Sequence, residues 1–511
     1  MVEDGQDSEP ADPDGVEGVA RRELLTAVAG VSGLAGLAGC FGLFDSDQSQ
    51  PQVQNGTVSG GGVNGTVPAI VVWQDDGGVV RADAGDGQVQ SGRQPAAVIQ
   101  AAIDISAQRP GIQSIEVVGN YALSEPVNLK RQTVLNLRDA HLTAGGNHAV
   151  ISVDGVSNAA VVGGVLDGSN QTDGEQYLGV LALNGADHVV VDGCEVRNGG
   201  YYGVNLYECN NCLLSGIRAR DNYRHGIHPG SDTENRGYFN WLIQCITDNN
   251  GVDGINDRGT TVAGESLNNA FYNCLSRNNG RSGFILAGGV ESDRVTTQYD
   301  VIGCRSFENE SHGIQFTNCR ASAVNVVTQS NGHSGLLLEG GVRASILNPR
   351  TNDHSGPESA GITIRDGVSA SPSHVVIYGG EATNNSRNVR IETSSDVGPI
   401  TLRDIDLRGA GEQTLAVVNS YPSALTVSNT PGYRTSNRGD LSRSGDGSTT
   451  TFRWQHYLAE QPRSVTVTPA TGEAASPFSV TADNDNIVVT YRNPPGQGNE
   501  NLRWWWEASA Y

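Results

Sequence analysis

The sequence predicts an all-β chain, in which a right-handed parallel β-helix is followed by a small C-terminal β-sandwich. Three observations predict this fold: 66 of the 511 residues are glycine and only 6% are aromatic, a short motif recurs every 22 to 30 residues, and the pattern changes after residue 432. A fixed period in this range is typical of a solenoid, whose coils bury their inward residues only against neighbouring coils. We therefore divide the chain into residues 1–40, 41–68, 69–432 and 433–511.

Residues 1–40 have the features of an export signal with a lipidation site. Arg21 and Arg22 precede a short apolar stretch that ends in Leu37-Ala-Gly-Cys40. A paired arginine before a weakly hydrophobic segment is typical of a twin-arginine signal, and the final tetrapeptide resembles a lipobox. The sequence thus predicts an extracellular protein that a lipidated Cys40 anchors to the outer face of the cytoplasmic membrane. Residues 41–68, rich in Gly, Ser, Gln and Asn, are expected to be a flexible linker.

The charge balance excludes some classes of partner. Asp and Glu number 56 against 33 Lys and Arg, the formal charge is -23, and Lys130 is the only lysine. Such a chain lacks the cationic surface that non-specific nucleic-acid binding needs, so we expect no nucleic-acid partner. No apolar run reaches the ~18 residues of a membrane-spanning helix. An acidic, lysine-depleted composition is typical of proteins from extreme halophiles.

The repeat aligns on an asparagine that is followed four residues later by a glycine. Apolar residues at alternate positions between turn residues mark short strands. We expect the asparagines to form a ladder in which each side-chain amide bonds the next at ~4.8 Å, and the glycines to supply the positive φ of a tight corner. The asparagines are Asn222, Asn250, Asn279, Asn309 and Asn331, and the glycines are Gly226, Gly254, Gly283, Gly313 and Gly335.

These repeats resemble those of the pectin-lyase-like superfamily of right-handed parallel β-helices. The resemblance extends upstream, where Ala82–Gly85, an expected helix at Pro95–Ala107 and an expected strand at Ile115–Tyr121 are similar to the start of pectate-lyase-type and tailspike β-helices. In that family an amphipathic helix caps the first coil, because an open solenoid end exposes apolar surface and free strand edges.

The candidate site lies where two consecutive coils break the repeat. The third position after the glycine should point inward and is apolar in most coils, but it is Pro229 and Asp257 in these two. Local rule-breaking is expected where a site overrides its scaffold, and the same coils carry the longest insertions. The catalytic candidates are His225, Asp253, His228, Tyr207 and Asp257, and the substrate-binding candidates are Arg224, Arg258, Arg281, Asn256 and Asp232.

His225 and Asp253 share a column in neighbouring coils, so we expect them to pair, which would orient the imidazole and raise its pKa. An arginine would neutralise a uronate carboxylate while a histidine or tyrosine moves the C5 proton, as β-elimination and C5-epimerisation both require. A hydrolase would instead need two carboxylates, for which Asp253 with Asp232 or Asp257 could serve.

Two segments resemble the mannuronan C5-epimerases. Asn222–Gly226 is similar to their arginine–histidine step, and Tyr202–Glu208 is similar to their Tyr-Gly-Phe-Asp-Pro-His-Glu segment, with Asn205 for the aspartate and Tyr207 for the histidine. The resemblance implies a cell-surface enzyme that acts on an acidic, uronate-containing polysaccharide, as a lyase or C5-epimerase before a hydrolase. The alternative is a non-catalytic glycan-binding or adhesion protein of the cell surface.

The cysteines give no metal motif. Without Cys40 seven remain, and four of them share one inward column, where a free cysteine acts as a small hydrophobe. The Cys209-Asn-Asn-Cys212 pair has no second pair to complete a zinc site. We expect no cofactor, leave Ca²⁺ at an acidic corner open, and leave a homotrimer open by analogy. The column consists of Cys194, Cys245, Cys274 and Cys304.

After Tyr433 the chain changes to short alternating runs at 464–468, 478–481 and 487–491, which predict the strands of the β-sandwich. Trp504, Trp505 and Trp506 lie near its end. Alternation in a strand sends at least one of them inward, so core packing is favoured over stacking on a sugar ring.

Overall fold

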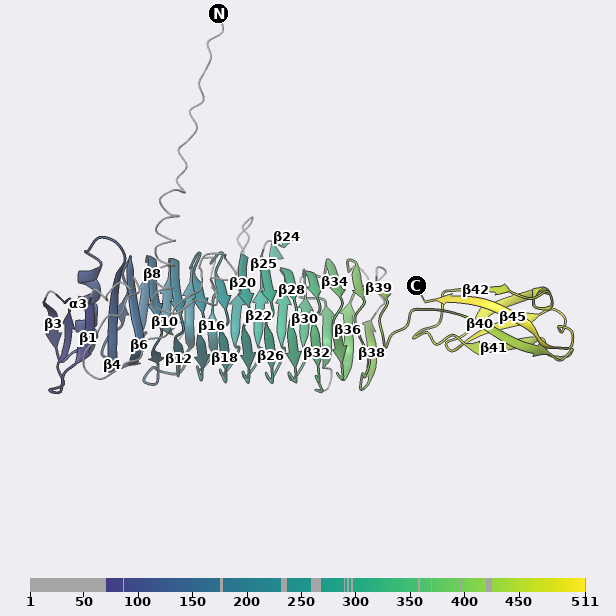
Figure 1. Cartoon of the computed structure of the whole chain (residues 1–511), viewed down its shortest axis with the longest axis horizontal. Helices are drawn as coiled ribbons and strands as arrows, with labels where there is room; N and C mark the ends of the chain where they lie inside the picture. The colour runs from purple at the N-terminus through teal and green to yellow at the C-terminus, as the bar shows by residue number, and fades with distance from the viewer. Residues whose placement is uncertain are drawn as a thin grey trace, which may run out of the picture. The chain divides into compact units, whose positions relative to one another are not determined.

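The computed structural model describes residues 70–510, except 86, 175–177, 231–236, 259–267, 289, 292–293, 296, 357–358, 369, 395–396 and 420–424. The predicted signal with Cys40, the predicted linker and Asp232 lie outside the described residues. The chain divides into two compact units, Met1–Ile285 and Leu286–Tyr511. The described residues form an all-β solenoid of about ten turns and small antiparallel sheets at the C-terminus (Figure 1), which confirms the predicted fold class.

Parallel strands from successive coils stack in the first unit. Most coils add two strands to a larger sheet and one to a smaller sheet, in register, as Leu213 beside Trp241 and Tyr202 beside His225 show. The larger sheet contains β4 (Gln113–Leu123), β6 (Thr133–Ala144), β8 (Ser157–Val162), β9 (Val165–Asp167), β11 (Asp187–Asp192), β12 (Glu195–Arg197), β14 (Leu213–Ser215), β15 (Arg218–Arg220), β17 (Trp241–Ile243), β18 (Ile246–Asp248), β20 (Asn268–Tyr272) and β21 (Leu275–Arg277). The smaller sheet contains β5 (Val127–Asn128), β7 (Ile151–Asp154), β10 (Gly179–Asn184), β13 (Tyr202–Tyr207), β16 (His225–His228), β19 (Ile255–Arg258) and β22 (Phe284–Ala287).

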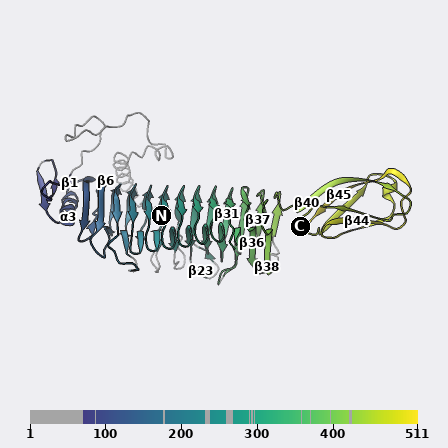
Figure 2. The same ribbon diagram turned by 90° about the horizontal axis from the view of Figure 1, so that it is seen from below.

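A helix covers the start of this unit, as the sequence predicts. The helix α3 (Pro95–Ser106) begins with proline at its first turn, where no backbone N–H is needed. Its apolar side is buried and packs against β3 (Gln88–Gly92) and β4 (Figure 2). Antiparallel pairing joins β3 to β2 (Val80–Asp83) and β2 to β1 (Ile70–Gln74), and β1 lies parallel to β4. Among the described residues, no helix has the length and apolar character needed to cross a bilayer.

The predicted asparagine ladder is present in both units. Asn222 donates its side-chain N–H to Asn250 Oδ1 at 2.8 Å, and Asn250 donates to Asn279 Oδ1 at 2.9 Å. In the second unit, Asn309 donates to Asn331 Oδ1 at 2.8 Å. These side chains are buried, and each one satisfies backbone and side-chain partners that would otherwise lack hydrogen bonds in the core.

The expected role of the repeat glycines is wrong. None of the five has a positive φ; the positive φ belongs to the residue before each asparagine, such as Asp221 and Asn249. The glycines are needed for space. A Cβ at Gly254 would overlap the Ser276 and Thr247 hydroxyl oxygens. The close approach of the Ser276 and Thr247 side chains therefore selects glycine at this position.

All seven described cysteines are free and buried. The four of the predicted column therefore do pack as core residues, and the Cys245 thiol donates to the backbone oxygen of Leu214 in the neighbouring coil. Burial raises the pKa of the Cys194 thiol, which makes it unreactive as a nucleophile.

The second unit repeats the same coil. Its larger-sheet strands are β25 (Gln298–Ile302), β26 (Arg305–Phe307), β28 (Arg320–Val324), β29 (Val327–Gln329), β31 (Arg343–Leu347), β32 (Arg350–Asn352), β34 (His374–Tyr378), β35 (Glu381–Thr383), β37 (Ile400–Arg403) and β39 (Leu425–Ser428). Its smaller-sheet strands are β27 (Ile314–Thr317), β30 (Leu336–Glu339), β33 (Ala360–Arg365), β36 (Arg387–Thr393) and β38 (Gln413–Asn419), and β23 (Val290–Glu291) pairs with β24 (Arg294–Val295) in a hairpin.

Two three-stranded antiparallel sheets follow, and they confirm the predicted strands. Trp504 is fully buried and donates its indole N–H to the Tyr491 hydroxyl at 2.9 Å, Trp506 is also buried, and Trp505 is exposed. Core packing thus accounts for two of the three tryptophans. The sheets consist of β40 (Ser436–Gly445), β45 (Gly498–Ser509) and β42 (Ser464–Pro469), and of β41 (Thr451–Gln455), β44 (Asn486–Tyr491) and β43 (Phe478–Ala482). A short 3-10 helix, η1 (Glu473–Ala475), lies between β42 and β43.

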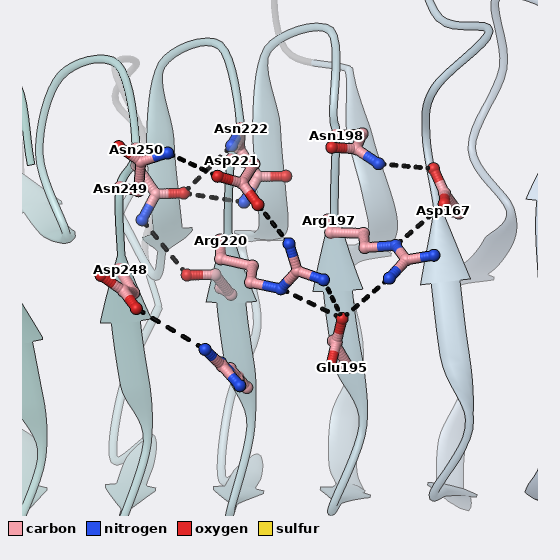
Figure 3. A network of polar contacts seen from close by, with 12 residues as sticks. Asp167, Glu195, Arg197, Asn198, Arg220, Asp221, Asn222, Asp248, Asn249 and Asn250 are labelled. Carbon is pink, nitrogen blue, oxygen red and sulfur yellow. Dashed lines mark hydrogen bonds and ion pairs between the residues drawn. The ribbon is translucent and has the colours of Figure 1, made fainter.

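On the outside of the first unit, arginines alternate with carboxylates across neighbouring coils (Figure 3). Arg197 contacts Asp167 at 2.9 Å and Glu195 at 3.2 Å, and Arg220 contacts the same Glu195 at 2.6 Å as well as Asp221. Each guanidinium is thus bracketed by acidic groups. Opposite charges on adjacent strands stabilise a sheet, whereas like charges destabilise it.

Candidate functional site

The candidate site lies on three consecutive strands of the smaller sheet in the first unit, namely β13, β16 and β19. Parallel register places Tyr202 beside His225 and Asn205 beside His228. Ile227, between the two histidines, is buried beside Ile255 of the next coil. The repeat therefore brings side chains that are far apart in the chain to the inter-strand distance of ~4.8 Å.

His225 is fixed through its Nδ1 atom, which lies 3.2 Å from the backbone N of Asp253. That N–H donates to Nδ1, so Nδ1 is the acceptor of the ring and Nε2 carries the proton. The ring is only 2% exposed. His225 thus has a fixed tautomer with an N–H donor at Nε2.

His225 and Asp253 are neighbours as predicted, with 3.2 Å between Nδ1 and Oδ2, but Nδ1 accepts the Asp253 backbone N–H, so the neutral ring forms no ion pair with the carboxylate. The expected rise in the pKa of His225 is wrong, however. Burial, followed by the charges of His228, Arg224, Arg281 and Arg258, holds the pKa of His225 well below its ordinary value. Desolvation disfavours the cation more than one carboxylate favours it. The imidazole is therefore neutral at neutral pH.

His228 has the opposite arrangement at Nδ1. This atom lies 2.6 Å from the backbone oxygen of Asn256, which can only accept, so Nδ1 carries the proton. In the neutral ring Nε2 is then the unprotonated nitrogen, the one that can act as a base. The rings of His225 and His228 stack with centroids 5.7 Å apart. The site thus pairs one imidazole that donates at Nε2 with one that accepts there.

Tyr202 belongs to the same stack, which the list of sequence candidates missed. Its ring centroid lies 4.5 Å from that of His228 and 5.4 Å from that of His225. The signal was present in the alignment, because Tyr202 occupies the position of His225 one coil earlier. The tyrosine is fully buried, so it supports both imidazole rings.

Asp253 is buried and fully engaged in hydrogen bonds. It accepts from Arg281 Nε at 2.8 Å, from Arg281 Nη2, from the Ser282 backbone N at 3.1 Å and from Asn256 Nδ2 at 2.6 Å. Asp253 thus contacts His225 through its backbone N–H, and its carboxylate holds Asn256, whose backbone carbonyl contacts His228. These contacts assign Asp253, Asn256 and Arg281 to positioning.

Arg224 and Arg258 remain as cations without a carboxylate partner among the described residues. The Arg224 guanidinium lies 4.8 Å from the Tyr201 ring centroid, a cation–π contact that leaves its charge uncompensated. The Arg258 side chain is exposed. Both lie close enough to His225 to lower its pKa. They could therefore bind an anionic group beside the histidines.

The two other catalytic candidates lie on β19 and β13. Asp257 is fully buried and accepts a hydrogen bond from Asn269 Nδ2 at 2.8 Å, while Asn269 accepts from the backbone N of Asn240. The Asp257 carboxylate is thus part of a buried hydrogen-bonded chain with Asn269 and Asn240. Tyr207 is half-buried at the C-terminal end of β13. In the part of the chain that the structure describes, no three His, Cys, Asp or Glu side chains gather as a metal site requires.

Comparisons with known proteins agree with this fold. Residues 178–372 match the family described as right-handed β-helix region. The coil is that of a right-handed parallel β-helix. The structure is similar to two Azotobacter vinelandii mannuronan C-5 epimerase modules. The AlgE6 A-module has a TM-score of 0.53 and 17% identity, and the match covers 66% of this chain and 95% of that chain. The AlgE4 A-module has a TM-score of 0.51 and 16% identity, and the match covers 65% of this chain and 96% of that chain. The Dettilon tailspike protein matches with a TM-score of 0.41 and 12% identity over 81% of this chain and 91% of that chain. No curated protein matches the sequence.

Proposed function

We propose that the chain is a polysaccharide-active enzyme that removes the C5 proton of a uronate residue in an acidic polysaccharide, as a lyase or a C5-epimerase. The observation that carries the proposal is the stacked pair of histidines, whose Nδ1 atoms are engaged in opposite ways. Such a pair supplies a base and a hydrogen-bond donor at one place, as proton abstraction next to a carboxylate requires.

In the first step the uronate carboxylate binds near Arg224 and Arg258, the two arginines near the histidines that lack a carboxylate partner among the described residues. His228 Nε2 takes the proton from C5, and the electron pair of the C5–H bond moves into the carboxyl group to give an ene-diolate. The Asn256 carbonyl accepts from Nδ1–H and so stabilises the imidazolium that forms.

His225 stabilises the charge that develops on the carboxyl group. Its lowered pKa keeps it a neutral imidazole, and its Nε2–H donates to the oxygen of the ene-diolate. A fixed donor aimed at a developing oxyanion is a large source of rate enhancement in a buried site. Both rings are 2% exposed, so the proposal requires the site to open before the substrate binds.

The second step distinguishes the two reactions. In a lyase the C4–O bond breaks, the C4=C5 double bond forms, and the leaving oxygen takes a proton. In an epimerase C5 takes a proton on its opposite face. Tyr202 in the stack and Tyr207 at the end of β13 carry the hydroxyls that could supply this proton. Tyr202→Phe and Tyr207→Phe variants, assayed separately, would identify the donor.

A hydrolase has less support from the geometry. Asp253 already accepts four hydrogen bonds from Arg281, Ser282 and Asn256, and Asp257 is bonded to Asn269 within the core. Neither carboxylate is placed to protonate a glycosidic oxygen or to activate water.

Proton NMR of acidic polysaccharides incubated with the full chain tests this proposal. We expect new unsaturated-uronate signals from a lyase or changed anomeric signals from an epimerase. His228→Ala should reduce the rate by about 10²–10⁴-fold, the usual contribution of a general base. His225→Ala should also reduce it, through loss of the donor.

The matched control is His312→Ala. His312 Nδ1 accepts from the Ser334 backbone N at 3.2 Å, the same contact that His225 makes with Asp253. His312→Ala thus removes an equivalent contact between coils and should leave the rate unchanged. If wild-type protein changes no polysaccharide in a broad panel yet binds some of them, the enzyme proposal is wrong and the glycan-binding alternative holds.

We also propose that the protein works outside the cell, anchored through Cys40. The support is the sequence alone, with Arg21, Arg22 and the lipobox-like tetrapeptide before Cys40. Mass spectrometry of the native N-terminus should find a lipidated Cys40, and Cys40→Ser should release the protein from the membrane. An intact N-terminus at Met1 would refute this localisation.

A further inference from the structure

The second unit has a surface that the histidine site does not use. It is the outer side of five successive larger-sheet strands, β25, β28, β31, β34 and β37, whose inward residues are buried. We call it the arginine face. Residues in register from strand to strand form three outward rows. The first row is Gln298, Arg320, Arg343 and His374; the second is Asp300, Ser322, Ser345, Val376 and Thr401; and the third is Ile302, Val324, Leu347, Tyr378 and Arg403.

The first row places the like charges of two arginines beside each other, with a histidine next to them. Arg320 is in register with Arg343, and Arg343 is in register with His374. All three side chains are exposed, and none has an ion-pair partner among the described residues. Cations directly opposite on adjacent strands, ~4.8 Å apart, destabilise a sheet. The row therefore costs stability, and a local cost of this kind is expected where a surface serves a function.

Elsewhere among the described residues, arginines that share a row have acidic partners, as Arg197 and Arg220 do although they are in register with each other. In the first unit Arg197 and Arg220 are bracketed by carboxylates (Figure 3). Within the second unit, Arg350 lies 2.9 Å from Glu381, and Arg365 lies 2.7 Å from Glu339. With 56 acidic against 33 basic residues, an uncompensated cationic row is against the composition. The pattern points to an anionic ligand.

The two other rows suit an extended ligand with hydroxyl groups and apolar ring faces. Ser322 and Ser345 line the middle row in register and can donate or accept hydrogen bonds. Leu347 and Tyr378 are 38% and 45% exposed in the third row, so they offer apolar contact beside the polar rows. Asp300 at one edge is the only carboxylate in the three rows among the described residues.

We propose that the arginine face binds an extended anionic polysaccharide that runs across the strands, with its carboxylate or sulfate groups against Arg320 and Arg343. Arg320 and Arg343 lie on successive coils at a strand spacing of ~4.8 Å, so neighbouring charged groups of one polysaccharide chain can contact both arginines. This binding surface lies apart from the histidine cluster in sequence and does not depend on whether those histidines are catalytic.

A lipid surface and a second copy of the chain are the competing occupants. An anionic membrane would attract the cations, but the third row exposes Leu347 and Tyr378 by only 38% and 45%, which leaves little apolar surface to insert. A second copy would have to bring its own acidic groups to Arg320 and Arg343, and the concentration dependence of the oligomeric state tests for this occupant.

The test measures the affinity of the full chain for a polyuronate, a sulfated polysaccharide and a neutral glucan over a range of salt concentrations. We expect binding to the anionic chains that weakens with salt. Arg320→Gln with Arg343→Gln should weaken binding about 2- to 30-fold, from the 0.2–1 kcal/mol typical of each of the two exposed ion pairs, and should lower the salt slope by about two.

Matched variants keep this result interpretable. Arg320→Lys with Arg343→Lys retains both charges and should bind almost as wild type. Arg350→Gln removes a guanidinium that Glu381 already neutralises and should have no effect. Each single glutamine variant should give part of the loss, and far-UV circular dichroism should be unchanged in all, because these side chains are exposed. In a His228→Ala background the affinity should be retained, which separates this proposal from the catalytic one.

Several outcomes would overturn the proposal. They are an unchanged affinity in the double glutamine variant, equal binding to the neutral glucan, binding to vesicles of anionic phospholipid but to no polysaccharide, and a concentration-dependent oligomer that the double variant abolishes. The last two would assign the arginine face to a membrane or to self-association.

Discussion

Replacing Asn250 with alanine should destabilise the coils that carry the histidine site. The buried Asn250 side chain makes four hydrogen bonds: Oδ1 accepts from Asn222 Nδ2 at 2.8 Å and from Asn222 N at 3.3 Å, and Nδ2 donates to Asn279 Oδ1 at 2.9 Å and to Ala219 O at 3.2 Å. All four are lost in Asn250→Ala. At about 1 kcal/mol net for each bond, the loss is about 4 kcal/mol, and the partners left without hydrogen bonds in the core add to it.

The assay is urea denaturation together with native-state hydrogen exchange. A solenoid can unfold in parts, so exchange identifies which strands lose protection, and we expect β16 and β19 to lose the most. The control is Asn184→Ala, whose exposed side chain makes a single hydrogen bond to Asp154 at 2.9 Å. It should cost less than about 0.5 kcal/mol. A loss below about 1 kcal/mol in Asn250→Ala would refute the assignment of stability to the ladder.

Three further predictions follow from buried polar and aromatic groups. Asp253→Asn should lower thermal stability by about 2–3 kcal/mol and slow catalysis, because one amide oxygen cannot accept the four hydrogen bonds that the carboxylate accepts; equal melting temperatures and rates would contradict this. Burial lowers the pKa of His354 to about 4, so the unfolded chain binds a proton below pH ~6.5 that the folded chain refuses, and stability should fall by about 3 kcal/mol between pH ~6.5 and about 4. Urea midpoints at pH 7 and 4.5 check this, and His354→Asn should flatten the difference. Trp504→Ala should cost about 3–5 kcal/mol as the loss of a fully buried side chain, whereas Trp505→Ser should cost less than about 0.5 kcal/mol, both measured by denaturation with tryptophan fluorescence.

The ladder and the strand register were predictable from the sequence because they depend on spacing alone. Asn222 and Asn250 occupy equivalent positions of the repeat, so any parallel stacking of coils brings their side chains together. The same reasoning brought His225 next to Asp253. It missed the function of Gly254, since the overlap that excludes a Cβ there involves side chains of two other strands.

The chemistry of the histidines was not predictable from the sequence. The pairing with Asp253 suggested a raised pKa for His225, but burial and the neighbouring cations outweigh that carboxylate. The opposite tautomers of His225 and His228 depend on two backbone groups, the Asp253 N–H and the Asn256 carbonyl, which no side-chain pattern reveals. Tyr202 was visible in the aligned column, but only the ring stacking shows that it belongs with both histidines.

The sequence by itself determined the solenoid, its register, its helical cap and the region where unusual side chains gather, because short-range periodicity dictates which residues face inward and which coils stack. The tertiary structure alone decided the protonation of the histidines, the commitment of Asp253 to positioning and the absence of acidic partners beside Arg320 and Arg343 among the described residues. These features depend on desolvation and on contacts between coils, which are set by the distances that folding creates rather than by the order of residues.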